Sequence, residues 1–264
     1  MTKVIKLIGF MAVLAFGVYA ALYQPVSAAT IQVDTLDDDT DDDGDCTLRE
    51  AILSAEETPA NDDCTAGSAG SDTINFSTAG TIIVGSAFEI NSDIIIDGAN
   101  DIVLDGDGTD RLFTILSGNV SIESLTIQNG MAIEGGAIYI TSTQSALMLD
   151  NVVLDSNIAS STVISNAPED GGAIALYNGT VSIMNSSITR NHADDDGGGI
   201  YNEGGHLTIV NSTISSNTGG SALFNTGGGI NSRDAAKTIL SFVTISNNSN
   251  GDGGGLAYPV GSSG

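Results

Sequence analysis

The stretch from His206 to Asn217 reads HLTIVNSTISSN, and its pattern decides the fold. Leu207 and Ile209 alternate with polar residues, and after a small polar pair the alternation resumes around Ile214. An alternation of period two that includes β-branched residues predicts β-strands. We therefore expect two short strands within these twelve residues.

The same twelve-residue pattern, called here the phrase, occurs five times, and the copies begin 27, 34, 26 and 31 residues apart. A period in this range with variable insertions is typical of a solenoid. Each copy contains two short alternating stretches, which are too short to form hairpins of their own. They pair best with the same stretch of the next coil, which gives parallel sheets. The sequence therefore predicts an all-β, right-handed parallel β-helix. The copies are 119–130, 146–157, 180–191, 206–217 and 237–248.

The last position of the phrase predicts a sharp corner. It is asparagine in four copies and glycine in the first. Both residue types tolerate the left-handed backbone conformation, and stacked asparagine amides bond to one another along a column. The column residues are Gly130, Asn157, Asn191, Asn217 and Asn248.

Each corner is followed by a glycine pair or triplet and an aliphatic residue, which predicts a turn and then a third strand. The spacing from corner to aliphatic residue varies between copies, so insertions collect at one edge. We expect loops at 158–170 and 218–226, where binding sites evolve most easily. The aliphatic residues are Ile138, Ile174, Ile200, Ile230 and Leu256.

Residues 73–118 contain looser versions of the pattern and predict the first coils. The apolar runs are 81–84, 94–96 and 102–104, and Asp-Gly turns follow the last two. The predicted β-helix covers 73–264, and because a solenoid needs a polar cap, we expect it to be truncated at the C-terminus.

The first residues predict export. Lys3 and Lys6 precede an uncharged apolar run from Leu7 to Leu22, and small residues follow it. This is the pattern of a secretory signal peptide, here 1–28, and the run is too short for a membrane span. We therefore expect an extracellular or cell-surface protein without a transmembrane helix in its mature part.

The charge balance restricts the partners. Beyond the signal peptide, five basic residues face 33 acidic ones, which leaves a formal charge of −28. Such a charge repels phosphate backbones and anionic headgroups, so it argues against nucleic acid and acidic membranes. It favours cations, although solubility alone also explains it.

Residues 29–72 form an Asp-rich segment that contains Cys46 and Cys64. In an oxidising compartment the two cysteines are expected to pair and to staple a short cap segment. The string CTLREA, at 46–51, resembles the CSLREA motif of bacterial exported proteins, with Thr47 in place of serine. The resemblance implies that a parallel β-helix follows this segment.

The glycine repeats resemble the GGAI repeats of polymorphic outer-membrane proteins, and 135–138 and 171–174 match literally. The phenylalanine of the accompanying FxxN pattern is replaced, by Leu154, Ile188, Ile214 and Ile245. The resemblance implies a surface or secreted β-helix of the adhesin and pectin-lyase-like type. It implies no reaction, because that fold carries enzymes and passive stalks alike.

The Asp-rich segment also matches a calcium-loop pattern. Asp39, Asp41 and Asp43 are spaced to present oxygens to one ion, Gly44 permits the turn, and Glu50 would close the shell. Asp45 is a further candidate ligand. Calcium is the one cofactor that the sequence suggests, and a solvated acidic linker is the alternative. A strand at 31–33 precedes the loop where a calcium-binding hand has a helix.

A second acidic feature is periodic, because an acidic residue precedes four of the five glycine runs. In stacked coils these side chains would form a column, where cations gather or protons bind more tightly. The ordinary preference for aspartate before glycine in turns also explains the pattern and is the explanation we favour from the sequence. The residues are Glu134, Asp170, Asp196 and Asp252, and Thr226 is the exception.

The best set for catalysis is Arg190 with Asp194 and Asp196 in one coil. These residue types would suit a polysaccharide lyase or glycoside hydrolase. However, few basic residues are available to bind a polyuronate. His192 and His206 have no metal-ligand spacing and are expected at the surface.

Two functions remain open. The first is a non-enzymatic adhesin or structural module that binds an extracellular carbohydrate or surface protein. The second is a carbohydrate-active enzyme built on Arg190.

Overall fold

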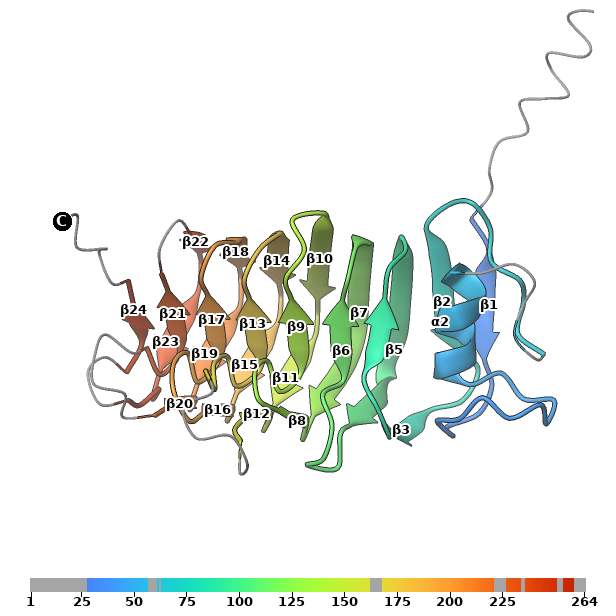
Figure 1. Ribbon diagram of the computed structural model, residues 1–264, viewed down its shortest axis with the longest axis horizontal. Helices are drawn as coiled ribbons and strands as arrows, with labels where there is room; N and C mark the ends of the chain where they lie inside the picture. The colour runs from blue at the N-terminus through green and yellow to red at the C-terminus, as the bar shows by residue number, and fades with distance from the viewer. Residues whose placement is uncertain are drawn as a thin grey trace, which may run out of the picture.

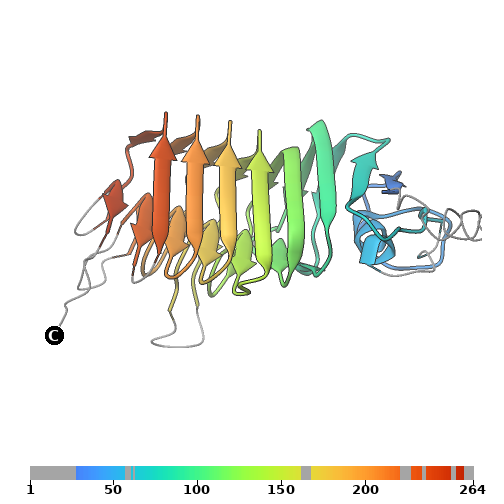
Figure 2. The same ribbon diagram turned by 90° about the horizontal axis from the view of Figure 1, so that it is seen from above.

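The computed structural model describes residues 28–56, 61, 63–161, 168–220, 227–233, 236–250 and 254–258. Within these residues the chain winds into a right-handed parallel β-helix, with one short α-helix at its N-terminal end (Figure 1). Seen from above, successive coils lie side by side along one axis (Figure 2). The predicted fold class is confirmed. The predicted signal peptide lies outside the described residues, except for Ala28.

The largest sheet, called here the long sheet, has 13 strands, and all its pairings are parallel. Its members are β1 (Thr30–Val33), β2 (Asp72–Phe76), β3 (Gly80–Ile83), β5 (Ile94–Asp105), β7 (Gly118–Gln128), β10 (Ser145–Asp150), β11 (Val153–Asp155), β14 (Thr180–Met184), β15 (Ser187–Thr189), β18 (His206–Val210), β19 (Thr213–Ser215), β22 (Lys237–Ser241) and β23 (Thr244–Ser246).

The second sheet, called the seven-stranded sheet, contains the predicted third strand of each coil. From the third member on, each strand begins at the expected aliphatic residue. The strands are β4 (Phe88–Ile90), β6 (Phe113–Ile115), β9 (Ile138–Ile140), β13 (Ile174–Leu176), β17 (Ile200–Asn202), β21 (Ile230–Ser232) and β24 (Leu256–Ala257).

A third, short sheet was not predicted. It consists of two-residue strands just after each corner, so the expected loops at 158–170 and 218–226 begin later than proposed. The rest of these loops, 162–167 and 221–226, lies outside the described residues. The strands are β8 (Met131–Ala132), β12 (Ile158–Ala159), β16 (His192–Ala193) and β20 (Thr218–Gly219).

The five phrases pair position by position. Asn119 pairs with Ala146, Ala146 with Thr180, Thr180 with His206, and His206 with Lys237. The first four copies therefore place their alternate aliphatic residues on one inner face, where they are almost fully buried, whereas Leu240 and Ile245 of the fifth copy are partly buried. Since an apolar side chain contributes about 1.5–3 kcal/mol when it is buried, this inner stripe supplies the main driving force for stacking.

The glycine runs allow the coils to approach closely. Gly171 has a left-handed φ of 69°, and a Cβ at Gly172 would lie 2.2 Å from the carbonyl oxygen of Gly198 in the next coil. No side chain fits there without a backbone shift. The prediction that these glycines form the turn before the third strand is therefore supported.

The corner prediction was right about the asparagines but wrong about their backbone. The left-handed residue is the one before the column, for example Ser156 (φ 56°) before Asn157 and Arg190 (φ 56°) before Asn191. The column asparagines instead point inward and bond to one another. In the early coils, the predicted Asp-Gly turn at Asp97 is a bulge inside β5, where the register shifts between Asp97 and Ile102.

The N-terminal segment covers the first coil. The strand predicted at 31–33 is confirmed as β1, and the expected disulfide between Cys46 and Cys64 is present. The helix α2 (Leu48–Glu56) that follows was not predicted. Its N-terminus is a capping box, in which the amide of Thr47 donates to Glu50 and the amide of Glu50 donates to the Thr47 hydroxyl.

Candidate functional site

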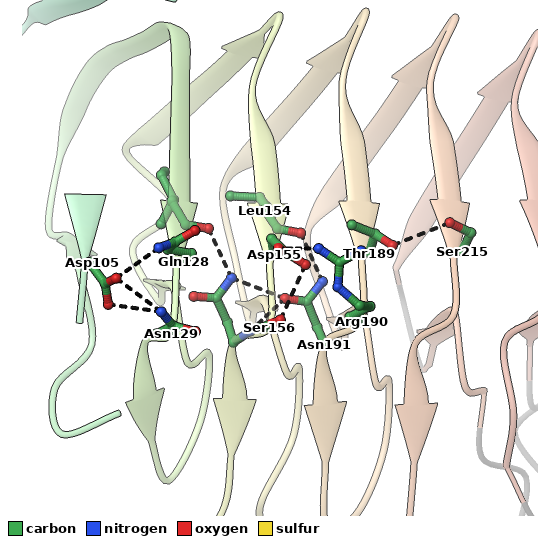
Figure 3. Close-up of polar contacts among 12 residues, drawn as sticks. Asp105, Gln128, Asn129, Leu154, Asp155, Ser156, Thr189, Arg190, Asn191 and Ser215 are labelled. Atoms are coloured by element: carbon green, nitrogen blue, oxygen red, sulfur yellow. Dashed lines mark hydrogen bonds and ion pairs between the residues drawn. The ribbon is translucent and has the colours of Figure 1, made fainter. Parts of the chain in front are cut away.

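The asparagine column is a closed hydrogen-bonded ladder. In Asn191 the side-chain oxygen accepts bonds from both the backbone N and the Nδ2 of Asn157, at 2.9 and 3.0 Å. Its Nδ2 donates to the carbonyl oxygen of Leu154, as Figure 3 shows, and to Asn217. Asn157, Asn191 and Asn217 are buried and fully bonded, so the column holds coils together and offers nothing to a ligand.

A second polar row lies on the outer face of the long sheet, beside this column (Figure 3). Gln128 donates to Asp105 at 2.7 Å, Arg190 pairs with Asp155, and the hydroxyls of Thr189 and Ser215 lie 3.4 Å apart. Burial works to raise the pKa of Asp105, but hydrogen bonds from Gln128, the backbone and Asn129 outweigh it and lower that pKa. These side chains satisfy one another from coil to coil.

The three residues considered for catalysis have different partners. Arg190 pairs with Asp155 of the preceding coil, and Asp196 pairs with Arg233 at 3.0 Å. Asp194 contacts His192 instead. Within the described part of the chain, no hydrogen bond or ion pair joins any two of the three proposed catalytic residues.

The group around Asp194 resembles a hydrolytic triad in composition only. Asp194 accepts a hydrogen bond from Ser160 and contacts Nε2 of His192 at 2.8 Å. The hydrogen bond from Ser160, together with His192, lowers the pKa of Asp194 although burial opposes it. In a triad the imidazole contacts the serine, whereas here the carboxylate does, so the arrangement does not activate Ser160.

The predicted acidic column is present for the three members that the structure describes, Glu134, Asp170 and Asp196. The backbone amide of Asp196 donates to Oδ1 of Asp170 at 2.9 Å, so the side chain of one column residue binds the main chain of the next. The fourth position, Asp252, and the exception, Thr226, lie outside the described residues. We call Glu134, Asp170 and Asp196 the acidic column.

Two members of the column have side-chain partners. Tyr177 donates its hydroxyl hydrogen to Glu134, and Arg233 pairs with Asp196. Asp170 has neither kind of partner, and burial raises its pKa to about 7; the amide of Asp196 opposes the shift, and repulsion from the carboxylates of Asp196 and Asp195 adds to it. Of the two predicted outcomes, cation binding or proton binding, this arrangement favours a proton on Asp170.

Three tyrosines lie beside the acidic column, on the outer face of the seven-stranded sheet. The ring of Tyr177 meets Tyr139 and Tyr201 edge-on, with centroids 5.9 and 5.6 Å away. Burial, first, and nearby carboxylates raise the pKa of all three phenols. We call these residues the tyrosine row.

Sequence reasoning missed the tyrosine row, although a signal was present. Tyr139 and Tyr201 each follow the aliphatic residue that starts a third strand, and Tyr177 follows the end of one. A residue next to an inward-pointing one faces outward on a strand. Three aromatic residues at such positions in successive coils are therefore candidates for contact.

The proposed calcium ligands make local contacts. Asp39 accepts a bond from the amide of Asp41, Asp43 accepts one from the amide of Asp45, and Glu50 is buried in the capping box. In the part of the chain that the structure describes, no three His, Cys, Asp or Glu side chains are grouped to hold a metal ion. Calcium binding by this loop stays a prediction.

Comparison with known proteins gives one partial match. Residues 185–203, which include β15 and β16, match the model of the Chlamydia polymorphic membrane protein (Chlamydia_PMP) repeat. No curated protein matches the chain. The helix α2 is too short to cross a membrane, and no other described helix could do so. Over 185–203 the chain is therefore similar to the repeat of polymorphic membrane proteins.

Proposed function

We propose that this chain is an exported, surface-exposed β-helix that acts as a non-enzymatic, adhesin-like binding module. The single observation that carries the proposal is the match of 185–203 to the polymorphic membrane protein repeat. The signal-peptide pattern at 1–28 and the resemblance of 46–51 to the CSLREA motif support export.

The architecture suits display. The asparagine column and the outer polar row are bonded from coil to coil, so they give a stiff rod whose side chains are already satisfied. The long insertions arise at one edge, after β12 and after β20. Binding surfaces on rigid scaffolds are commonly built from such edge segments.

Surface exposure can be tested on intact cells that produce the protein. Antibodies against the folded chain should label unpermeabilised cells, and external protease should remove that label while a cytoplasmic control protein survives. A label that appears only after permeabilisation would contradict the proposal.

The enzymatic alternative has no arrangement of described residues in its favour, because Arg190, Asp194 and Asp196 have separate partners. Incubating the purified chain with pectins, alginates and neutral glycans tests it directly. Cleavage that Arg190→Ala abolishes would replace the binding proposal with the catalytic one.

A further inference from the structure

The arginines at the two ends of the tyrosine row indicate which kind of ligand this row would bind. At one end the guanidinium of Arg111 lies 4.5 Å from the centroid of Tyr139 and donates to the carbonyl oxygens of Glu134 and Gly135. At the other end Arg233 pairs with Asp196. The chain therefore already places planar cations against this layer of rings and acidic groups, as cation–π and charge-assisted contacts favour.

The middle of the row has the same chemistry without an arginine. Tyr177 lies between the other two rings and is bonded to Glu134. Among the ion pairs of the described residues, none includes Glu134, Asp170 or Glu203, the partner of the Tyr201 hydroxyl.

One buried acceptor at this layer also lacks a hydrogen bond. The side chain of Asp196 is 8 % exposed, and its Oδ1 accepts no hydrogen bond within the part of the chain that the structure describes. A buried carboxylate oxygen without a donor costs free energy. Because this oxygen has almost no contact with solvent, it adds to the negative charge at this layer without itself meeting a ligand.

The surrounding negative charge determines which sign of charge a ligand should carry. Partly exposed carboxylates of Glu134, Asp195 and Glu203 lie near the row and the acidic column, and the chain beyond its predicted leader carries a formal charge of −28. A field of this kind attracts cationic partners and repels anionic ones. No described acidic group is arranged for a metal ion, whereas aromatic faces beside carboxylates suit guanidinium and ammonium groups.

We propose that the partly exposed side chains at this layer, Glu134, Tyr139, Tyr177 and Glu203, form a docking face for a basic, arginine- and lysine-containing segment of a partner protein. Asp170, Asp196 and Tyr201 are buried and support this face from within the coil. This inference rests on the proposed function, because it names the partner chemistry of the binding module. The segment lies along the seven-stranded sheet, with a guanidinium over Tyr177 and near Glu134.

The test is calorimetric titration of the purified chain, at physiological salt, with an oligo-arginine peptide. The citrulline peptide of the same length is the neutral control, and only the arginine peptide should bind. Glu134→Gln with Glu203→Gln should weaken binding about tenfold, because both remove carboxylates from the face.

The matched control is Asp42→Asn with Asp101→Asn, which removes the same charge from exposed positions elsewhere. Affinity should stay within about twofold of the parent. Equal losses in both double variants would show attraction by bulk charge and overturn the proposal. Absence of binding by the parent, or equal binding of the citrulline peptide, would overturn it as well.

A second pair of variants separates docking from folding. Arg233→Gln removes a positive charge beside the docking face, so the arginine peptide should bind about threefold more tightly. Arg190→Gln removes the same charge at Asp155 on the long sheet and should leave the affinity unchanged. Circular dichroism shows whether the Arg233→Gln variant is folded. Weaker binding by the folded variant would contradict the proposed docking face.

Failure of this inference is distinguishable from failure of the proposed function. If intact cells display the protein but the purified chain ignores the arginine peptide, only the docking face is wrong. If external antibodies and protease never reach the protein, the surface role fails whatever the peptide does.

Discussion

The guanidinium of Arg49 makes two parallel hydrogen bonds to the carboxylate of Asp38, Nε to Oδ1 and Nη2 to Oδ2, both of 2.8 Å. The same guanidinium lies 4.6 Å from the ring centroid of Phe88 and donates to the carbonyl oxygen of Ser86. One side chain of α2 thereby joins the N-terminal segment to the first strand of the seven-stranded sheet. The pair is well shielded, since the Asp38 side chain is 4 % exposed.

Replacing Arg49 by glutamine should therefore destabilise the N-terminal cap. It leaves the shielded carboxylate of Asp38 without its partner, which costs about 3 kcal/mol of unfolding free energy. Arg190→Gln is the matched control, because its guanidinium is 62 % exposed beside Asp155, and its cost should stay below about 1 kcal/mol. Urea unfolding curves measure both, and equal losses would argue against a fixed cap.

Removing the disulfide should destabilise the same N-terminal region without unfolding the rest of the β-helix. A loop closed between Cys46 and Cys64 contributes about 3 kcal/mol through the unfolded state. In the variant Cys46→Ala with Cys64→Ala, amides of β1 and α2 should exchange hydrogen faster, while amides of β14 and β18 should keep their protection. Uniform loss of protection along all coils would show that the cap governs global folding.

The two asparagines of one coil should differ sharply in their contribution. Asn191→Gly deletes four hydrogen bonds of the buried column and should cost about 2–4 kcal/mol, whereas Asn185→Gly, at an exposed left-handed position, should cost less than about 1 kcal/mol. Glycine occupies the column at Gly130, so the backbone tolerates it. Thermal unfolding provides the comparison, and similar costs would contradict a stabilising column.

The buried carboxyl of Asp170 should make stability depend on pH. Its pKa is raised to about 7 in the folded chain, above the ordinary 3.8, so the folded state holds more protons between these values. The free energy of unfolding therefore falls as pH rises through this window and levels off above about 7.

Asp170→Asn should remove that dependence. Its Oδ1 can still accept from the amide of Asp196, so near pH ~4 the variant should match the parent, while above the window it should exceed the parent by about 4 kcal/mol. Urea unfolding at several pH values provides the measurement, with Asp101→Asn as the exposed control. A parent and variant with parallel pH profiles would mean that Asp170 is ionised like a surface carboxylate.

Calcium uptake by the Asp-rich loop is a separate prediction. Calorimetric titration of the chain with calcium should release or absorb heat that Asp41→Ala with Asp43→Ala removes. Asp97→Ala with Asp101→Ala, in β5, removes equal charge as a control. A flat titration at millimolar calcium would leave the capping box of Thr47 and Glu50 as the whole role of this motif.

The coils could be predicted because their residues repeat the same physical requirements. Ile138, Ile174 and Ile200 begin the third strands as expected, since an aliphatic residue after a tight glycine turn has one place to be buried. The left-handed corner residue was misplaced by one position. Ser156 and Arg190 adopt that conformation, and serine and arginine are not residue types that predict a left-handed backbone.

The site was less predictable, because it depends on contacts between coils of different length. The spacing of Glu134, Asp170 and Asp196 indicated a column, but not its partners. Arg233 forms an ion pair with Asp196, and the Tyr177 hydroxyl donates a hydrogen bond to Glu134. The helix α2 could have been found from the Thr47-x-x-Glu50 capping box. That signal overlapped the calcium-loop pattern, and both interpretations assign a role to Glu50.

The most direct test of the whole account is the register between successive coils. In the parallel arrangement Ser187 pairs with Thr213 and Thr189 with Ser215. Cysteines introduced at either pair should form a disulfide under mild oxidation, because neighbouring parallel strands lie about 4.8 Å apart. The crossed pairs, Ser187→Cys with Ser215→Cys and Thr189→Cys with Thr213→Cys, are too far apart and should stay reduced. Disulfides in the crossed pairs but not in the direct ones would show antiparallel strands and contradict the β-helix.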